Sequence, residues 1–260
     1  MNKIDCANTI MEGIKLYGMK SKPFIVKKTN DIIFDYKKLK ENIIKENINI
    51  YTTDKDTLEY VENINLKDKL IEWENDMLKY NFTDSNISND IYNYNNININ
   101  ELKKFGVGLT MCSSNTYTPF HIDSTNKNMG GGGWVYLYKG TKKWNIIEFF
   151  DAINNIYNQQ GKYLIDVNCQ NNNNYNYSIY QCEISEGDFI YFPPGWAHQV
   201  ITSVKSIGLN GYMLLESDYD YIENINKWYN ETSNYSDCGL LHRPLSQHEI
   251  NTYKKLNNVN

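Results

Sequence analysis

Short apolar runs separated by turn residues fill the second half of the chain and predict a β-rich core. The runs are Val107–Cys112, Pro119–Ile122, Trp134–Tyr138, Lys143–Ile147, Tyr177–Ile184, Phe189–Phe192, Gln199–Thr202 and Ile207–Leu215. Turn signals such as Lys139-Gly140 and Pro193-Pro194-Gly195 lie between them. Many short strands separated by turns of this kind are typical of a β-sandwich or a β-barrel.

Helical patterns flank this β-rich region on both sides. Within residues 65–80, the apolar residues Leu66, Leu70, Trp73 and Met77 recur at every third or fourth position with charged residues between them, which predicts an amphipathic helix. Residues 36–46 and the segment after Ser217 also have helical patterns. The Asn-, Ser- and Asp-rich residues 81–100 predict a loop.

These patterns predict a mostly β fold with flanking helices, divided into three regions. We expect an N-terminal helical and mixed region over residues 1–105 that packs on the core. The β-rich core spans residues 106–216, with a polar, Asn-rich insertion at 151–176. A helical tail follows over residues 217–260. A chain of 260 residues suits this organisation, since it is long enough for one sizeable hydrophobic core.

Composition and charge narrow the class of protein. Hydrophobic residues make up 41% and charged residues 22%, as in globular domains. The net charge of -5 does not indicate direct nucleic-acid binding. No apolar run approaches the roughly eighteen residues that a membrane span needs, and the start lacks the apolar segment of a signal peptide. We therefore expect a soluble intracellular protein of the nucleus or cytoplasm. The five scattered Cys exclude a zinc knuckle.

Three residues have the chemistry of a metal site. His121 and Asp123 are spaced i, i+2, which places both on one face of a strand. His198 comes 77 positions after His121, at the start of the strand that follows Phe189–Phe192 and a Pro/Gly bend. Two imidazoles and one carboxylate form the facial triad of non-heme Fe(II) oxygenases, although a catalytic zinc site is the other interpretation. His242 and His248 lack a second ligand at a useful spacing and are not expected to bind metal.

Three lysines follow the Gly-rich turn. Lys142 shares a strand face with Trp144, whereas Lys143 points to the opposite face. A Lys inside a small β-barrel is costly unless it meets an anion. Lys139 and Lys143 are interpreted as surface charges.

The order of these motifs resembles the JmjC family of Fe(II)- and 2-oxoglutarate-dependent dioxygenases. The segments that carry the resemblance are Tyr117–Asp123, Trp134–Lys142 and Gly187–His198, within a region from Gly106 to Tyr212. The family implies a double-stranded β-helix, which is a cupin-like jelly roll, with helices packed around it. The sequences of these motifs are most similar to those of the F-box and PHD-finger branch of histone lysine demethylases. Small JmjC protein hydroxylases have the same motifs in the same order.

The resemblance also implies roles for individual residues. His121, Asp123 and His198 would bind Fe(II), while Thr118 and Lys142 would hold the distal carboxylate of 2-oxoglutarate. An Asn that contacts the site in many members corresponds to Asn210, although ungapped counting reaches Tyr212 instead. The implied reaction consumes 2-oxoglutarate and O2, releases succinate and CO2, and hydroxylates a C–H bond. On an N-methyl group, the hydroxylated product releases formaldehyde.

Two features depart from the demethylase branch. That branch has a Tyr after the Trp, whereas this chain has Val135, with Tyr136 one position later. Because a one-residue change reverses the face, Tyr136 cannot substitute unless a bulge re-aims it. Gly130–Gly133 also lengthens the turn after Asp123, next to the expected substrate entrance.

Several functions fit these features. The first is oxidation of a side chain in a protein or peptide, with histone N-methyl-lysine as the substrate that the motif wording favours. The nearest alternative is hydroxylation of a protein side chain. Two other possibilities are a catalytically inactive, cupin-like binding protein and a zinc-dependent hydrolase. The hydrolase would leave Lys142 without a role.

Overall fold

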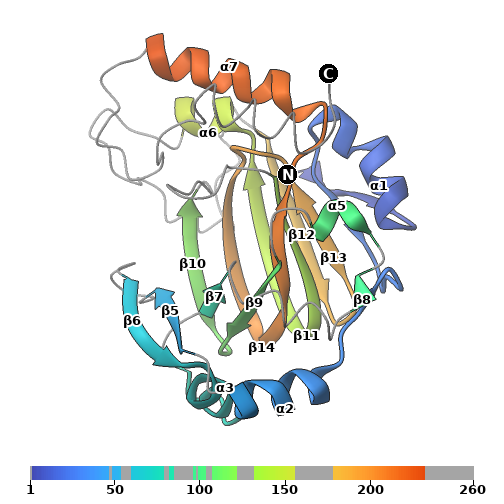
Figure 1. The fold of residues 1–260 in the computed structure, drawn as a ribbon. Coiled ribbons are helices and arrows are strands. Elements are labelled where there is room, and N and C mark those ends of the chain that lie inside the picture. The colour runs from blue at the N-terminus through green and yellow to red at the C-terminus, as the bar shows by residue number, and fades with distance from the viewer. Residues whose placement is uncertain are drawn as a thin grey trace.

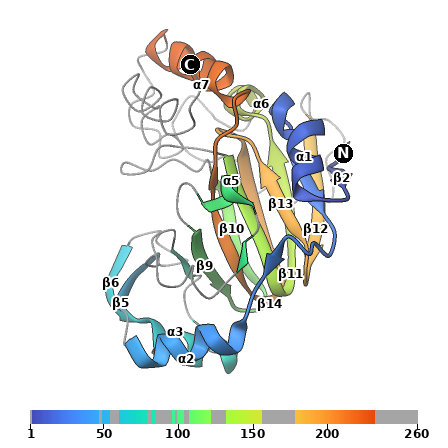
Figure 2. The same cartoon turned by 45° about the vertical axis from the view of Figure 1, so that its right-hand side comes forward.

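Figures 1 and 2 show the fold in a computed structural model. The structure describes residues 2–46, 49–53, 60–78, 82–84, 96–97, 99–103, 107–121, 132–155 and 178–231. Strands predominate, and they curl into a nearly closed barrel of mixed parallel and antiparallel pairs. The predicted jelly-roll, cupin-like core with flanking helices is confirmed.

The barrel is one ten-stranded sheet within the residues that are described. Its C-terminal strands are β9 (Val107–Cys112), β10 (Thr116–His121), β11 (Gly132–Ile147), β12 (Ile179–Ser185), β13 (Phe189–Phe192) and β14 (Ala197–Met213). Its N-terminal strands are β1 (Asn2–Lys3), β2 (Asp5–Ala7), β3 (Phe24–Val26) and β7 (Phe82–Asp84). Two small sheets stand apart from it: β4 (Ile32–Ile33) with β8 (Asn96–Ile97), and β5 (Asn49–Thr53) with β6 (Tyr60–Asn65).

Two long strands, β11 and β14, are central to the barrel. They pair with each other along almost their whole length. At one end β11 also pairs with β13, and beyond Gly140 it pairs with β12 instead. The register shifts around this glycine, whose φ of +103° is readily adopted only by Gly. The sequence predicted a turn at Lys139-Gly140. That prediction was wrong, because the glycine bends a continuous strand rather than ending it.

The N-terminal segment contributes strands as well as helices. β3 pairs with β13, β1 pairs with β12, and β7 pairs with β9. The sheet therefore extends beyond residues 106–216, while the proposed division at residue 106 stays a prediction. The predicted loop at residues 81–100 was wrong in part, since β7 and β8 lie within it. Most of the predicted insertion at 151–176 lies outside the described residues.

Helices cover the outside of the barrel. They are α1 (Ile10–Leu16), the 3-10 helix η1 (Gly18–Lys20), α2 (Tyr36–Glu46), α3 (Leu66–Glu74), α5 (Asn100–Lys103), α6 (Phe149–Asn155) and α7 (Asp218–Glu231). α2 and α3 lie at one end of the barrel, and α6 and α7 lie at the other (Figures 1 and 2). None of the helices in the described ranges is long and apolar enough to cross a membrane.

Alternation along β11 separates two hydrophobic clusters. Trp134 and Tyr136 belong to an outer cluster that includes the buried side chains of the N-terminal helices. Val135 and Leu137 point the other way and belong to an inner cluster. The inner cluster also contains Trp144, Ile146, Ile184, Ile190, Phe192, Trp196 and Val200. This inner face also carries Lys142 and His198, two of the residues that the sequence singled out.

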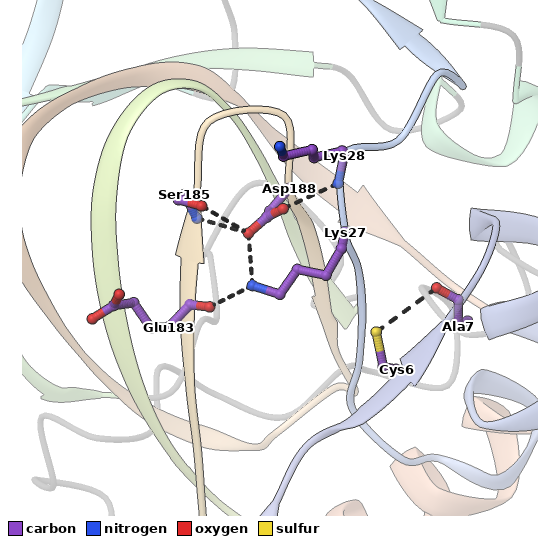
Figure 3. Close-up of polar contacts among 7 residues, drawn as sticks. All are labelled: Cys6, Ala7, Lys27, Lys28, Glu183, Ser185 and Asp188. Carbon is purple, nitrogen blue, oxygen red and sulfur yellow. Dashed lines mark hydrogen bonds and ion pairs between the residues drawn. The ribbon is translucent and has the colours of Figure 1, made fainter.

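A buried carboxylate fastens the N-terminal segment to the barrel. Asp188, in the turn before β13, accepts hydrogen bonds from the backbone N–H groups of Ser185 and Lys28 and from the Nζ of Lys27 (Figure 3). The Nζ atom of Lys27 also donates to the carbonyl oxygen of Glu183. Since these donors come from β12 and from the segment after β3, the carboxylate joins elements that lie far apart in the sequence.

Candidate active site on the inner face of the barrel

The register of β10 against β14 brings two histidine positions opposite each other. Thr118 pairs with Val200, and His121 pairs with His198. The step between these pairs is three residues on β10 but two on β14, so β10 contains a bulge. In a regular strand, Thr118 and His121 would lie on opposite faces, and the extra residue resets the alternation. The bulge therefore places both positions on the same side of the sheet.

His198 is held by its surroundings. Its side chain is 3% exposed, and its Nδ1 lies 3.1 Å from the carbonyl oxygen of Trp196. When Nδ1 donates to that carbonyl, the neutral ring carries its lone pair on Nε2, the atom that can bind a metal. The ring centroids of Phe192 and Trp144 lie 4.3 and 5.6 Å from the centroid of the imidazole. Both rings belong to the inner cluster, so the imidazole packs against the inner face.

Lys142 and Lys143 have opposite environments, as the sequence predicted. Lys142 lies opposite Thr202 of β14 and is only 5% exposed. Its neighbour Lys143 is exposed and lies 3.8 Å from the carboxylate of Glu183. Trp144 is buried on the same face as Lys142. The alternation of the strand is therefore enough to separate a buried ammonium from a solvated one.

The buried ammonium of Lys142 contacts a thiol. Its Nζ donates to the Sγ of Cys112 at 3.2 Å, and both groups are buried. No carboxylate pairs with Lys142 among the residues described. A buried ammonium without an anion is costly, so this one fits a site for an anionic ligand. The sequence did not single out Cys112, because a lone thiol in a strand carries no motif.

Thr118 and Lys142 lie on strands that pair with opposite edges of β14. Thr118, half-buried on β10, pairs with Val200, and Lys142 on β11 pairs with the nearby Thr202. Partners in adjacent strands share a face. The two proposed 2-oxoglutarate residues are thus on the face that His198 also occupies.

Asn210 and Tyr212 also lie on this side of β14. Asn210 pairs with Val135 of the inner cluster, and Tyr212 pairs with Gly133. The Oδ1 atom of Asn210 is buried and has no hydrogen-bond partner within the described part of the chain. Buried polar atoms are normally satisfied, so this oxygen fits a site that a ligand or water completes. That observation favours Asn210 over Tyr212.

Tyr136 does not replace the aromatic residue that the demethylase branch has at position 135. Val135 belongs to the inner cluster, whereas Tyr136 is buried in the outer one, where burial raises its pKa. The register is regular here, with Val135 opposite Ile190 and Tyr136 opposite Phe189. No bulge re-aims the side chain, as the alternation predicted.

Two of the four glycines that the sequence assigned to the Gly-rich turn lie in a strand. Gly132 and Gly133 are strand residues of β11 rather than turn residues. A Cβ on Gly133 would lie 2.2 Å from the ring of Phe192, and one on Gly132 would lie 2.5 Å from the ring of Tyr191. These two glycines are required because side chains of β13 occupy the space. Gly130 lies outside the described residues.

The third proposed metal ligand, Asp123, also lies outside the described residues, as do His242 and His248. Within the part of the chain that the structure covers, no group of three His, Cys, Asp or Glu side chains gathers as a metal site. The metal triad therefore stays a proposal, for which the structure supplies His198 and the position opposite it.

Comparison with known protein families matches residues 108–211 to the JmjC domain, described as a hydroxylase. The match begins in β9 and ends in β14, so it covers the strands that carry the inner-face residues. The core of this chain is a JmjC domain. JmjC domains have a cupin fold and are generally Fe(II)- and 2-oxoglutarate-dependent oxygenases. The observed barrel agrees with that fold, and the family resemblance predicted from the sequence is confirmed.

Proposed function

We propose that this JmjC protein is an Fe(II)- and 2-oxoglutarate-dependent oxygenase that oxidises a protein side chain. The observation that supports the proposal best is the buried Lys142, which has no carboxylate partner among the described residues and lies on the face of His198 and Thr118. An inactive binding protein has no need to keep a buried ammonium in this place. When bound, Fe(II) and 2-oxoglutarate supply the oxidation of a C–H bond by O2, with release of succinate and CO2.

The side chains of this chain would position those groups. His198 presents Nε2 because Nδ1 is engaged by the Trp196 carbonyl, and His121 and Asp123 complete the proposed triad. Lys142 and Thr118 would hold the distal carboxylate of 2-oxoglutarate by charge-assisted hydrogen bonds. The wall formed by Trp144, Phe192 and Val200 is apolar and excludes water from the reacting groups.

The substrate that we propose first is N-methyl-lysine in a protein such as a histone. The support is the wording of the motif Thr118-Pro119-Phe120-His121-Ile122-Asp123, which resembles the demethylase branch. A specific observation favours side-chain hydroxylation as the second candidate. Val135 faces the inner cluster where that branch has a Tyr, and the matching family is described as a hydroxylase.

The test measures turnover and product together. The purified protein is loaded anaerobically with Fe(II), supplied with 2-oxoglutarate and O2, and assayed for succinate. Libraries of methyl-lysine and unmodified peptides are then examined by mass spectrometry. Loss of a methyl group with release of formaldehyde supports demethylation, and gain of one oxygen supports hydroxylation.

Two variants make the assay specific to the proposed site. His198→Ala removes a proposed ligand and should abolish both iron binding and succinate formation. Lys143→Ala alters an exposed charge on the opposite strand face and should leave both unchanged. If the iron-loaded wild-type protein forms no succinate and modifies no peptide, the enzyme proposal fails and an inactive binding protein is the better explanation.

A further inference from the structure

Cys112 and Lys142 form a buried pair of nucleophiles to which the proposed reaction assigns no joint role. The two residues lie on β9 and β11, thirty positions apart in the sequence. Their side chains are 3% and 5% exposed, and Nζ lies 3.2 Å from Sγ. Reacting atoms in productive complexes are typically about 3–3.5 Å apart. The fold therefore holds an amine and a thiol at reacting distance.

The groups around this pair are polar, and no carboxylate of the described residues pairs with Lys142. The Oγ1 atom of Thr110 lies 4.0 Å from the sulfur. Ser206 lies opposite Cys112 in the register of β9 and β14 and is 0% exposed. Its hydroxyl has no hydrogen-bond partner in the described part of the structure. A buried hydroxyl without a partner can serve a polar group that is formed or bound beside it.

We propose that the Cys112–Lys142 pair is an oxidant-sensitive covalent switch at the cosubstrate anchor. Hydrogen peroxide first oxidises the thiol to a sulfenic acid, and the peroxide is reduced with release of one water. The Nζ of Lys142, as the amine, then attacks the sulfur. The S–O bond breaks and an S–N bond forms. The departing hydroxide takes an amine proton and leaves as a second water.

The access of the oxidant follows from the proposed reaction. That reaction already requires O2 to reach this interior, and hydrogen peroxide is a molecule of similar size. Ser206 lies opposite Cys112 and can hydrogen-bond the sulfenic oxygen, because its hydroxyl lacks another partner among the described residues. Thiol reductants reopen the S–N bond and restore the free lysine.

The consequence for activity rests on the proposed function, as does the route by which the oxidant reaches the pair, whereas the mass measurement of the bond does not. A sulfenamide removes the positive charge of Lys142 and ties its nitrogen to β9. The distal carboxylate of 2-oxoglutarate then lacks its cation. Removing one partner from a buried ion pair costs roughly 3–5 kcal/mol, so affinity for 2-oxoglutarate should fall about a hundredfold or more.

The first experiment looks for the bond. The full chain is treated with hydrogen peroxide, digested without reductant, and analysed by mass spectrometry. The expected product is a pair of peptides joined between Cys112 and Lys142, which dithiothreitol separates. Cys6→Ser removes an exposed thiol and should keep the cross-link, as should Lys143→Ala. Cys112→Ser should lose it. Conversion of Cys112 to sulfinic acid or to a disulfide, without a link to Lys142, would overturn the proposal.

The second experiment separates this inference from the proposed function. Binding of 2-oxoglutarate is measured by calorimetry with Mn(II) in place of Fe(II), before peroxide, after peroxide and after reductant. Reversible loss of binding supports the switch. If the reduced protein never binds 2-oxoglutarate but still forms the cross-link, the proposed function fails alone. If the reduced protein binds it and peroxide changes neither binding nor peptide mass, the switch fails alone.

Discussion

Lys142 shows how one strand position separates two chemically identical side chains. It is 5% exposed, whereas its neighbour Lys143 lies in solvent beside Glu183. If Lys142 anchors the cosubstrate, Lys142→Ala should raise the apparent KM for 2-oxoglutarate about a hundredfold, because the carboxylate loses a buried partner. Iron affinity should change little. The measurement is succinate formation as a function of 2-oxoglutarate concentration.

Lys143→Ala is the matched control for that prediction. It removes the same charge from the same strand but from the exposed face, where an ion pair contributes little. Its KM should equal that of the wild type. Similar behaviour of the two variants would mean that this part of β11 is only a charged surface.

Asp218 is a fully buried carboxyl whose surroundings make it sensitive to pH. It accepts hydrogen bonds from the hydroxyl of Tyr191 at 3.2 Å, from the backbone N–H of Leu215 at 2.8 Å and from the hydroxyl of Ser21 at 3.4 Å. Burial nevertheless raises its pKa from 3.8 to about 7, since these neutral donors offset only part of the lost hydration. The group joins the start of α7 to β13 and to the end of η1.

The raised pKa of Asp218 predicts that the stability of the fold falls as pH rises. Between pH 4 and pH 7 the folded state retains a proton that the unfolded chain has released, so the free energy of unfolding declines as pH rises through this window. The loss from this group is on the order of 4 kcal/mol. Asp218→Asn should therefore raise the melting temperature at pH 8 and change it little at pH 4.

Thermal unfolding of the two proteins across this pH range checks the prediction. Asp220→Asn, at an exposed position of the same helix, serves as the control and should keep the wild-type pH profile. An Asp218→Asn profile that is parallel to the wild type, or a lower melting temperature at pH 8, would show that ionised Asp218 does not weaken the fold.

At the scale of elements, Asp188 determines how the N-terminal segment attaches to the barrel. The carboxylate is 1% exposed and satisfies two backbone N–H groups as well as the Nζ of Lys27 at 2.7 Å (Figure 3). Asp188→Ala leaves those part-buried backbone donors without a partner, each at a cost of about 1–3 kcal/mol. We expect a total loss of roughly 3–5 kcal/mol in the free energy of unfolding.

Lys27→Met should cost much less, about 1 kcal/mol, and distinguishes the two halves of this contact. The Lys27 side chain is 47% exposed, and the carboxylate keeps its backbone donors when the ammonium is removed. Urea denaturation of both variants measures the difference. Equal losses would mean that the ion pair, and not the backbone donors, holds β3 against β13.

At the scale of the whole molecule, the JmjC barrel is completed by strands from outside its matched segment. β1, β2, β3 and β7 all precede residue 106, and β3 covers one edge of β13. A fragment of residues 106–216 would leave this edge unpaired and would expose the outer face around Trp134 and Tyr191. We therefore expect the fragment not to fold cooperatively.

Circular dichroism during heating checks this expectation, with the full chain as the reference. The full chain should show a cooperative transition, whereas the fragment should show none and should aggregate. A fragment that melts cooperatively would support the division of the chain at residue 106 and would make the N-terminal strands an addition to an independent domain.

Much of the fold follows from local patterns that the sequence displays. Phe189–Phe192 is β13, Val107–Cys112 is β9, and residues 36–46 form α2 with the expected bounds. Long-range pairing decided the rest. β7 forms in the Asn-rich segment only because β9 offers its edge, and the predicted runs at 199–202 and 207–215 are one strand because β9, β10 and β11 pair along it.

The family of the core and the alternation of its strands follow from the sequence alone. The order of the motifs indicated a JmjC core, and the period of two in a strand correctly separated Lys142 from Lys143 and Val135 from Tyr136. These properties depend only on residue type and on the local geometry of the backbone.

Which of these residues meet depends on long-range pairing between strands. The bulge in β10 places Thr118 and His121 on one side of the sheet, although their spacing in a regular strand would separate them. The contact between Cys112 and Lys142 arises because β9 and β11 both pair with β14. The physical reason is that register and bulges are set by the partner strands, whose hydrogen bonds and packing join positions that no local pattern connects.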